Sequence, residues 1–148
     1  MCVTEAIFVK ISKEKLMLNG IIPASWSGPL HAALRIVTGL LFLEHGTTKF
    51  LHFPATEYFP AGQPLPALMM VAGGLEIVGG SLIILGLFTR ITAFVLAGQM
   101  AVAYFLAHIP MSFFPVQNQG EAAIMFCFVF LYLAAAGAGP WSMDASRK

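Results

Sequence analysis

Residues 31–54 constrain this chain most, because they are apolar enough to enter a lipid bilayer and yet contain several ionisable side chains. Ionisable groups near the centre of a membrane-spanning helix each cost roughly 2.5 to 3.5 kcal/mol on insertion scales, so they normally face a bundle interior or a wet cavity. At helical spacing, Arg35, His45, Lys49 and His52 share one face. Glu44 lies about 100° around the helix from His45. The segment therefore predicts a membrane helix whose polar side chains point mainly in one direction.

Composition supports an integral membrane protein. Hydrophobic residues make up 58% of the sequence and charged residues 10%, whereas soluble domains have about 25% charged residues. The mean hydropathy is +0.82. A length of 148 residues suits one domain of a few helices, and a net charge of +1 argues against nucleic acid as a partner. We expect an all-α protein embedded in the lipid bilayer.

Four apolar stretches, each close to the twenty residues that a membrane-spanning helix needs, are separated by segments rich in Pro and Gly. They predict a four-helix bundle with membrane spans at 31–51, 66–86, 90–109 and 120–138. These spans belong to one domain, 31–144, between an N-terminal cytoplasmic or interfacial segment, 1–30, and a tail, 145–148.

The positions of Lys and Arg predict the orientation, because these residues accumulate on the cytoplasmic side of membrane proteins. Only Lys49 lies toward the side of the loops 53–66 and 110–119. The opposite side carries Lys10, Lys13, Lys15, Arg35, Arg90, Arg147 and Lys148. We therefore expect a multi-pass protein with cytoplasmic N and C termini, and with both of those loops outside.

Polar residues on different predicted spans converge at a similar depth. In the second span Glu76 shares a face with Gly73 and Gly80, where a neighbouring helix can approach closely. Glu121 stands at a helix N-terminus, where the helix dipole favours a carboxylate. With this topology, the outer half of the bundle gathers Glu44, His45, Lys49, Tyr104, His108 and Glu121, above a floor of Glu76 and Gln99. Such convergence predicts an outward-facing polar pocket.

The ordered set of short motifs over residues 31–144 resembles the DoxX family of small four-helix membrane proteins. The motif residues are Arg35, Gly39, Phe42, Gly46, Lys49, Glu76, Gly79, Gly80, Gly86, Thr89, Arg90, Asn118, Gly120, Glu121, Gly137, Gly139, Ser142 and Asp144. The resemblance implies a bacterial or archaeal cytoplasmic (inner) membrane, and an association with quinone-linked or sulfur-linked redox systems or with oxidative or thiol stress. The similar DoxD proteins are subunits of thiosulfate:quinone oxidoreductase. Packing roles are implied for Gly39, Gly46, Gly79 and Gly80, and a shared polar site for Arg35, Lys49, Glu76 and Glu121.

Several candidate residues have a structural interpretation beside a functional one. Lys49 and Glu76 form either an ion pair that only fixes helix register or part of a catalytic or ligand site. Arg35 is either a topology anchor or a ligand contact. The histidines 45, 52 and 108 have the chemistry of metal ligands, but no ExxH or HxxxH spacing supports a metal site, and we expect none.

Two functions remain open. In the first, the chain is an accessory subunit of a quinone-linked or sulfur-linked redox system, a quinone accepts hydrogen bonds from Lys49 or His45, and Glu44, Glu76 or Glu121 relays protons. The sequence carries no haem, flavin, iron–sulfur or CxxC motif, so electrons would come from a partner subunit or a reduced sulfur compound. In the second, it is a non-catalytic module that binds a small hydrophobic ligand or scaffolds a partner protein. Whether it is an enzyme, and whether it forms a homo-oligomer, both stay open.

Overall fold

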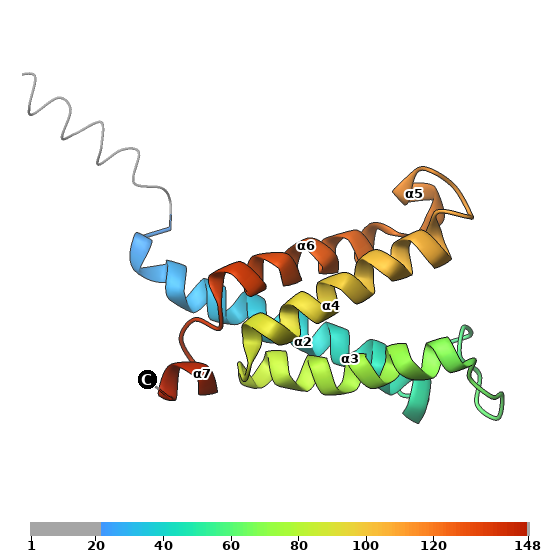
Figure 1. Cartoon of the computed structure of the whole chain (residues 1–148), viewed down its shortest axis with the longest axis horizontal. Helices are drawn as coiled ribbons and strands as arrows, with labels where there is room; N and C mark the ends of the chain where they lie inside the picture. The colour runs from blue at the N-terminus through green and yellow to red at the C-terminus, as the bar shows by residue number, and fades with distance from the viewer. Residues whose placement is uncertain (1–21, 148) are drawn as a thin grey trace, which may run out of the picture.

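The structure is a computed structural model that describes residues 22–147, which are mostly helical and contain no strand. The predicted segment 1–30 thus lies mostly outside the described residues. Four long helices run side by side along the molecule, as Figure 1 shows: α2 (Ser27–Leu51), α3 (Ala67–Leu85), α4 (Thr89–Ala103) and α6 (Glu121–Ala136). The short elements are η1 (Ala24–Trp26), η2 (Tyr104–His108), α5 (Pro115–Asn118) and α7 (Met143–Ser146). The all-helical fold class is confirmed.

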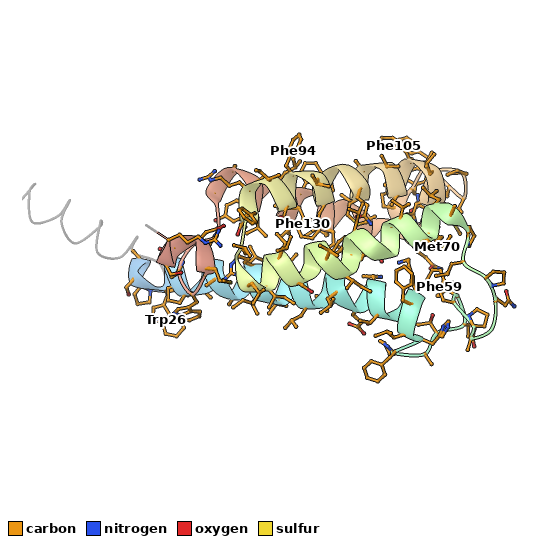
Figure 2. The ribbon with its side chains drawn as sticks, turned by 60° about the horizontal axis from the view of Figure 1, so that its bottom comes forward. Trp26, Phe59, Met70, Phe94, Phe105 and Phe130 are labelled. Carbon is orange, nitrogen blue, oxygen red and sulfur yellow. The ribbon has the colours of Figure 1, made fainter. Side chains whose placement is uncertain are left out.

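Three helical segments are long and apolar enough to cross a membrane: Ala24–Leu51, Ala67–Leu85 and Thr89–His108. The fourth, Glu121–Ala136, is apolar but shorter. Most side chains on the outer faces of the helices are apolar and exposed, as a lipid environment requires. In Figure 2, Phe94 on α4 and Phe105 on η2 point outward, whereas Phe130 points between the helices.

Local chemistry sets the ends of the helices. The long helix α2 begins at Ser27, earlier than the expected His31. Pro29 is tolerated in its first turn, because a backbone N–H at that position would have no acceptor within the helix. At the end of α3, Gly86 adopts a left-handed conformation with φ 63°, and its N–H donates to the carbonyl of Ile83. The tight turn that follows reverses the chain into α4.

The helices pack as two close pairs. Helix α2 packs along α3 and α4 along α6, while fewer contacts join the two pairs. Glycines make the first pair close: a Cβ on Gly39 would lie 3.0 Å from the carbonyl oxygen of Gly80, and one on Gly46 would lie 3.0 Å from that of Gly73. The hydrophobic core lies between the pairs and comprises Phe42, Ile83, Ala93, Leu96, Ala97, Met100, Phe130 and Leu133.

A polar cluster closes the end of the bundle where α2 begins and α3 turns into α4. The fully buried Arg35 guanidinium donates to carbonyls of both α3 and the segment after α6, including those of Ile83 at 2.7 Å, Ala138 at 2.9 Å and Trp141 at 2.7 Å. Asp144, on α7, accepts hydrogen bonds at 2.9 Å from the backbone N–H groups of Phe88 and Thr89. These contacts tie the C-terminal segment across the bundle end.

Candidate functional site

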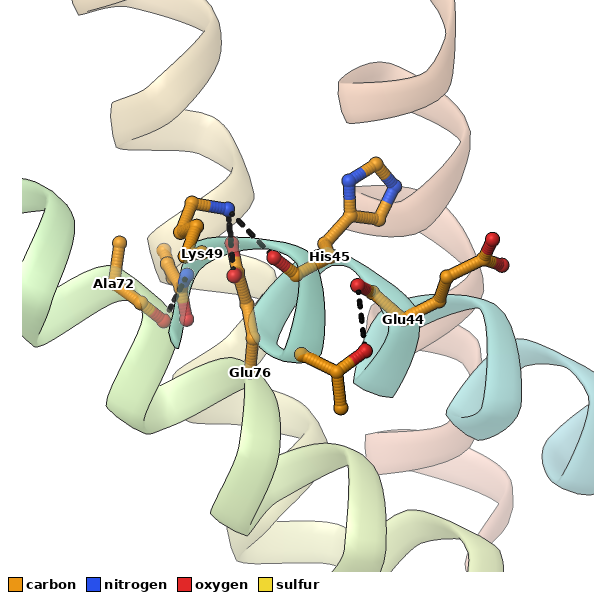
Figure 3. Close-up of polar contacts among 7 residues, drawn as sticks. Glu44, His45, Lys49, Ala72 and Glu76 are labelled. Atoms are coloured by element: carbon orange, nitrogen blue, oxygen red, sulfur yellow. Dashed lines mark hydrogen bonds and ion pairs between the residues drawn. The ribbon is translucent and has the colours of Figure 1, made fainter. Parts of the chain in front are cut away.

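The Lys49 ammonium and the Glu76 carboxylate form an ion pair inside the bundle. Lys49 lies in the last turn of α2 and Glu76 in the middle of α3, and only 7% and 5% of their respective surfaces are exposed. Lys49 Nζ donates to Oε2 of Glu76 at 2.7 Å and to Oε1 at 2.9 Å. Figure 3 shows the two side chains pointing toward each other across the close α2–α3 contact. Burying two charges is tolerable here because each neutralises the other with good geometry.

The remaining hydrogen-bonding capacity of Lys49 is also used. Its Nζ lies 3.2 Å from the backbone carbonyl oxygen of His45, so each of the three ammonium N–H groups has an oxygen acceptor. The ring of Phe59, from the loop after α2, lies with its centroid 5.1 Å from Nζ, a distance at which a cation–π attraction operates. A ligand that accepts a hydrogen bond from Lys49 must therefore replace one of these acceptors.

A cavity of about 560 Å³ adjoins the ion pair, between α3 and α4. This volume lies within the range of small-molecule sites in proteins, about 300 to 1,000 Å³. The lining is largely apolar and comes from all four long helices. Its polar and ionisable members are His45, Lys49, Glu76, Gln99, His108 and Gln119. A small molecule with an apolar body and one or two polar groups matches this lining.

Two of these polar residues have hydrogen-bonding capacity left for a ligand. The Gln99 amide nitrogen donates to the carbonyl of Ala72 on α3 at 3.2 Å, which orients the amide, while its buried Oε1 has no hydrogen-bond partner within residues 22–147. The His45 ring packs edge-on against Phe126 with centroids 5.8 Å apart and makes no hydrogen bond to another described residue. A polar ligand would satisfy the buried Gln99 oxygen, and the exposed His45 imidazole is free to bind one as well.

At the far end of the cavity, His108 is held in place by Nδ1, which lies 2.8 Å from the carbonyl oxygen of Asn118. Tyr104 stacks on the His108 ring with centroids 6.2 Å apart but does not line the cavity. Both belong to η2, a π-helical turn in which Ile109 N–H donates to the Tyr104 carbonyl at 3.0 Å. Such turns often occur at functional sites.

Four of the predicted site residues do not line the cavity: Tyr104, described above, and three that lie farther away. Glu44 is exposed and points away from the ion pair (Figure 3). Glu121 is exposed in the first turn of α6. Arg35 caps carbonyl groups at the opposite end of the bundle, as described above. The structure therefore brings together His45, Lys49, Glu76, Gln99 and His108, with Tyr104 beside them.

The glycines proposed for helix packing all stand at close contacts. A Cβ added to Gly79 would lie 2.7 Å from Leu96 on α4, and one added to Gly73 would lie 2.7 Å from the ring of Phe50. Gly39, Gly46 and Gly80 make the α2–α3 contacts given above. Within residues 22–147, no group of three or more His, Cys, Asp or Glu side chains is placed to hold a metal ion.

Sequence reasoning did not identify Phe59, Gly98 and Phe126 as parts of the site, although all three line the cavity. Phe59 belongs to a proline-rich loop whose path no periodicity reveals. Gly98 has no functional group, and Phe126 is one of several aromatic residues in an apolar run. On this side of the cavity, the sequence signal comes from Gln99, which follows Gly98 and is a polar residue in the middle of an apolar helix.

The fold and the site define a small helical membrane protein with a buried ion pair beside an apolar cavity. Residues 30–109 match the DoxX family, and the chain belongs to it. An uncharacterized protein of Haemophilus influenzae is 46% identical over 116 residues, which cover 76% of this chain and 87% of that protein.

Two more distant relatives are also similar to the chain. The Bacillus subtilis protein named "Putative oxidoreductase CatD" is 29% identical over 112 residues, covering 75% of this chain and 81% of the relative. An uncharacterized membrane protein of Mycobacterium tuberculosis is 28% identical over 153 aligned positions, covering 87% of this chain and 92% of the relative. No solved structure matches the chain significantly.

Proposed function

We propose that the chain is a membrane accessory subunit of a quinone-linked or sulfur/thiol-linked redox system, and that its cavity binds a small molecule such as a quinone. The observation that carries the proposal is the position of the buried Lys49–Glu76 pair on the wall of an apolar cavity between α3 and α4. Ionisable residues inside a membrane protein usually mark a substrate, ion or proton pathway. The printed name of the Bacillus subtilis relative supports redox chemistry, at 29% identity.

The residues present fit a quinone. A quinone supplies two-electron redox chemistry and takes up two protons on reduction. The His45 ring N–H is available to donate to a carbonyl oxygen, and Lys49 Nζ becomes available when it exchanges its bond to the His45 carbonyl for one to the ligand. Glu76 holds the ammonium in place and is the carboxylate in the cavity wall that can accept or release a proton. Electrons come from a partner subunit or a reduced sulfur compound.

We further propose that α6 crosses the bilayer with the three longer helices, and that both termini are cytoplasmic in a bacterial or archaeal inner membrane. Arg90 lies next to the turn between α3 and α4, and Arg147 follows α7 at the same end of the bundle (Figure 1). The excess of positive charge near this end supports its cytoplasmic placement. The cavity then lies in the outer half of the membrane.

A non-catalytic role is the second candidate, and the saturation of Lys49 favours it. Because all three ammonium N–H groups have acceptors within the protein, the ion pair is complete without a ligand. In this case the pair fixes the register of α2 on α3, and the cavity holds a small hydrophobic molecule or the chain scaffolds a partner protein.

The two candidates are distinguished by what co-purifies with the protein. Detergent-purified protein is examined by ultraviolet–visible spectroscopy and by mass spectrometry of its lipid extract. The double variant Lys49→Met/Glu76→Leu removes both charges together, which avoids a lone buried charge. Glu57→Gln, at an exposed carboxylate in the loop after α2, is the control.

Under the redox proposal, wild type and Glu57→Gln carry a quinone or another redox-active molecule, and the folded double variant has lost it. Equal amounts of the bound redox-active molecule in all three proteins would show that the ion pair has only a packing role. A redox-inactive hydrophobic molecule in all three would favour the second candidate.

A further inference from the structure

Two apolar helix faces border the opening of the cavity. On α3, Leu68, Val71 and Leu75 recur at intervals of three and four residues and so share one face. On α4, Val95 and Val102 lie two turns apart on one face. All five side chains line the cavity and are at least 36% exposed. In a bilayer, faces of this kind contact lipid chains.

Gly98 interrupts the apolar face of α4 that borders the cavity. It lies three residues after Val95 and four before Val102, which places it on the same face and between them. Gly98 lines the cavity, and a Cβ added to it would meet no atom within 4 Å. The apolar face of α4 therefore has a gap at Gly98, where no side chain covers the backbone.

The two helices separate toward the cavity. Well inside both helices, Gly79 on α3 and Leu96 on α4 are so close that a Cβ on Gly79 would lie 2.7 Å from the leucine side chain. From the turn that joins them, α3 and α4 diverge along the bundle, as Figure 1 shows. Gly98 lies two residues beyond Leu96 on α4, and the cavity that it lines is also lined by residues of α3.

The end of the bundle beside the cavity is covered by its loops. Phe59 lies over Lys49, and the Tyr58 hydroxyl donates to the Gln119 side-chain oxygen at 3.5 Å, which joins the loop after α2 to the residue two before Glu121. These contacts place protein between the cavity and the aqueous phase at this end. The lateral gap between α3 and α4 is then the more direct route.

From this geometry we propose, building on the function proposed above, that the cavity takes a ligand with a hydrocarbon tail from the bilayer. The ring of the ligand lies beside Lys49, Glu76 and His45, and its tail leaves between α3 and α4 past Gly98. Gly98 is the residue that determines whether a tailed molecule fits. A large side chain at this position closes the gap without touching the ion pair.

The test compares two probes that share a ring, 2,3-dimethoxy-5-methyl-1,4-benzoquinone and its 6-decyl derivative. Binding of each to detergent-purified protein is measured by titration calorimetry for wild type, Gly98→Leu and Gly74→Leu. Gly74 is the matched control because a Cβ there also meets nothing within 4 Å, while Gly74 does not line the cavity. Both leucines thus enter open space on a helix exterior.

We expect Gly98→Leu to bind the decyl probe at least about tenfold more weakly than wild type, the scale of a steric block in an apolar pocket. It should bind the tailless probe as wild type does, and Gly74→Leu should bind both as wild type does. Equal decyl binding by Gly98→Leu and wild type would overturn the role of Gly98 alone. If Gly98→Leu binds neither probe, the ring of the ligand lies at Gly98, and the proposed tail path is overturned. If wild type binds neither probe, this inference and the quinone proposal are overturned together.

Discussion

The Lys49 ammonium lies 2.7 Å and 2.9 Å from the two carboxylate oxygens of Glu76, which makes the contact bidentate and buried. The close approach of α2 and α3 at Gly46 and Gly73 makes this geometry possible. A side chain on either glycine would push the helices apart and lengthen both N–O distances. The glycine contacts and the ion pair therefore depend on one another.

Removing one member of the ion pair should destabilise the protein more than removing both. We expect Lys49→Met to lower the free energy of unfolding by about 3 kcal/mol, because Glu76 is left as a lone buried charge. The double variant Lys49→Met/Glu76→Leu should recover most of this loss. Unfolding in detergent followed by circular dichroism measures both. Equal losses in the single and double variants would contradict the assignment of a compensated buried pair.

The α2–α3 contact should not tolerate even a methyl group at Gly46. A Cβ there would lie 2.9 Å from the backbone nitrogen of Ile77, which cannot move away as a flexible side chain can. We expect Gly46→Ala to lower the free energy of unfolding by about 2 kcal/mol through overpacking.

The control for this variant is Gly74→Ala, which gains the same helix propensity and meets no neighbour. Thermal unfolding of the two purified variants in one detergent compares them directly. A Gly46→Ala protein as stable as Gly74→Ala would show that α2 and α3 are less closely packed than described.

Asp144 should make stability depend on pH in the acid range. Burial opposes its ionisation, but the N–H groups of Thr89 and Phe88 more than offset this and hold the pKa of Asp144 below its ordinary value of 3.8. The carboxylate therefore stabilises the folded chain above pH 3.8, and this contribution is lost as the pH falls through the lower, folded-state pKa.

Near neutral pH, Asp144→Ala should cost about 1 kcal/mol, as for loss of a helix cap. The difference in unfolding free energy between wild type and Asp144→Ala should shrink as the pH falls below about 4. A difference that stays constant from neutral pH into the acid range would show that the charge of Asp144 does not contribute.

Membrane orientation is open to direct labelling. In a chain with Cys2 and Cys127 replaced by serine, single cysteines at Thr56 and Gln117 should react with an impermeant maleimide added to intact cells. A cysteine at Ser146, on α7, should react only after the membrane is made permeable. The reverse pattern would place the cavity in the cytoplasmic half of the bilayer.

The sequence predicts the helical class well because apolar stretches of membrane length and Pro–Gly breakers are strong local signals. It also offers a Lys49–Glu76 ion pair as one of two interpretations of these residues, because a buried charge in lipid needs a partner. Arg35 shows the limit of this reasoning. Its five guanidinium N–H groups reach carbonyls more than forty residues away in sequence, and no local pattern distinguishes such a cap from a ligand contact.

The sequence predicts an outward-facing polar pocket, but not that the lining of the cavity is largely apolar or that it lies between α3 and α4, because these features depend on how the two helices are placed. Phe59 reaches Lys49 only through the path of a loop, and Gly98 contributes an empty space rather than a functional group. Features that depend on the relative placement of helices and on missing side chains have no periodic signal.

Photolabelling tests the central claim, a ligand site beside the Lys49–Glu76 pair, most directly. A decyl benzoquinone carrying an azide on its ring is illuminated with the purified protein, and modified peptides are identified by mass spectrometry. The account predicts adducts on cavity residues such as Met69, Met100 and Phe126, and their loss in Lys49→Met/Glu76→Leu. Labelling spread over the outward-facing Phe94 and Phe128, and unchanged in the double variant, would contradict it.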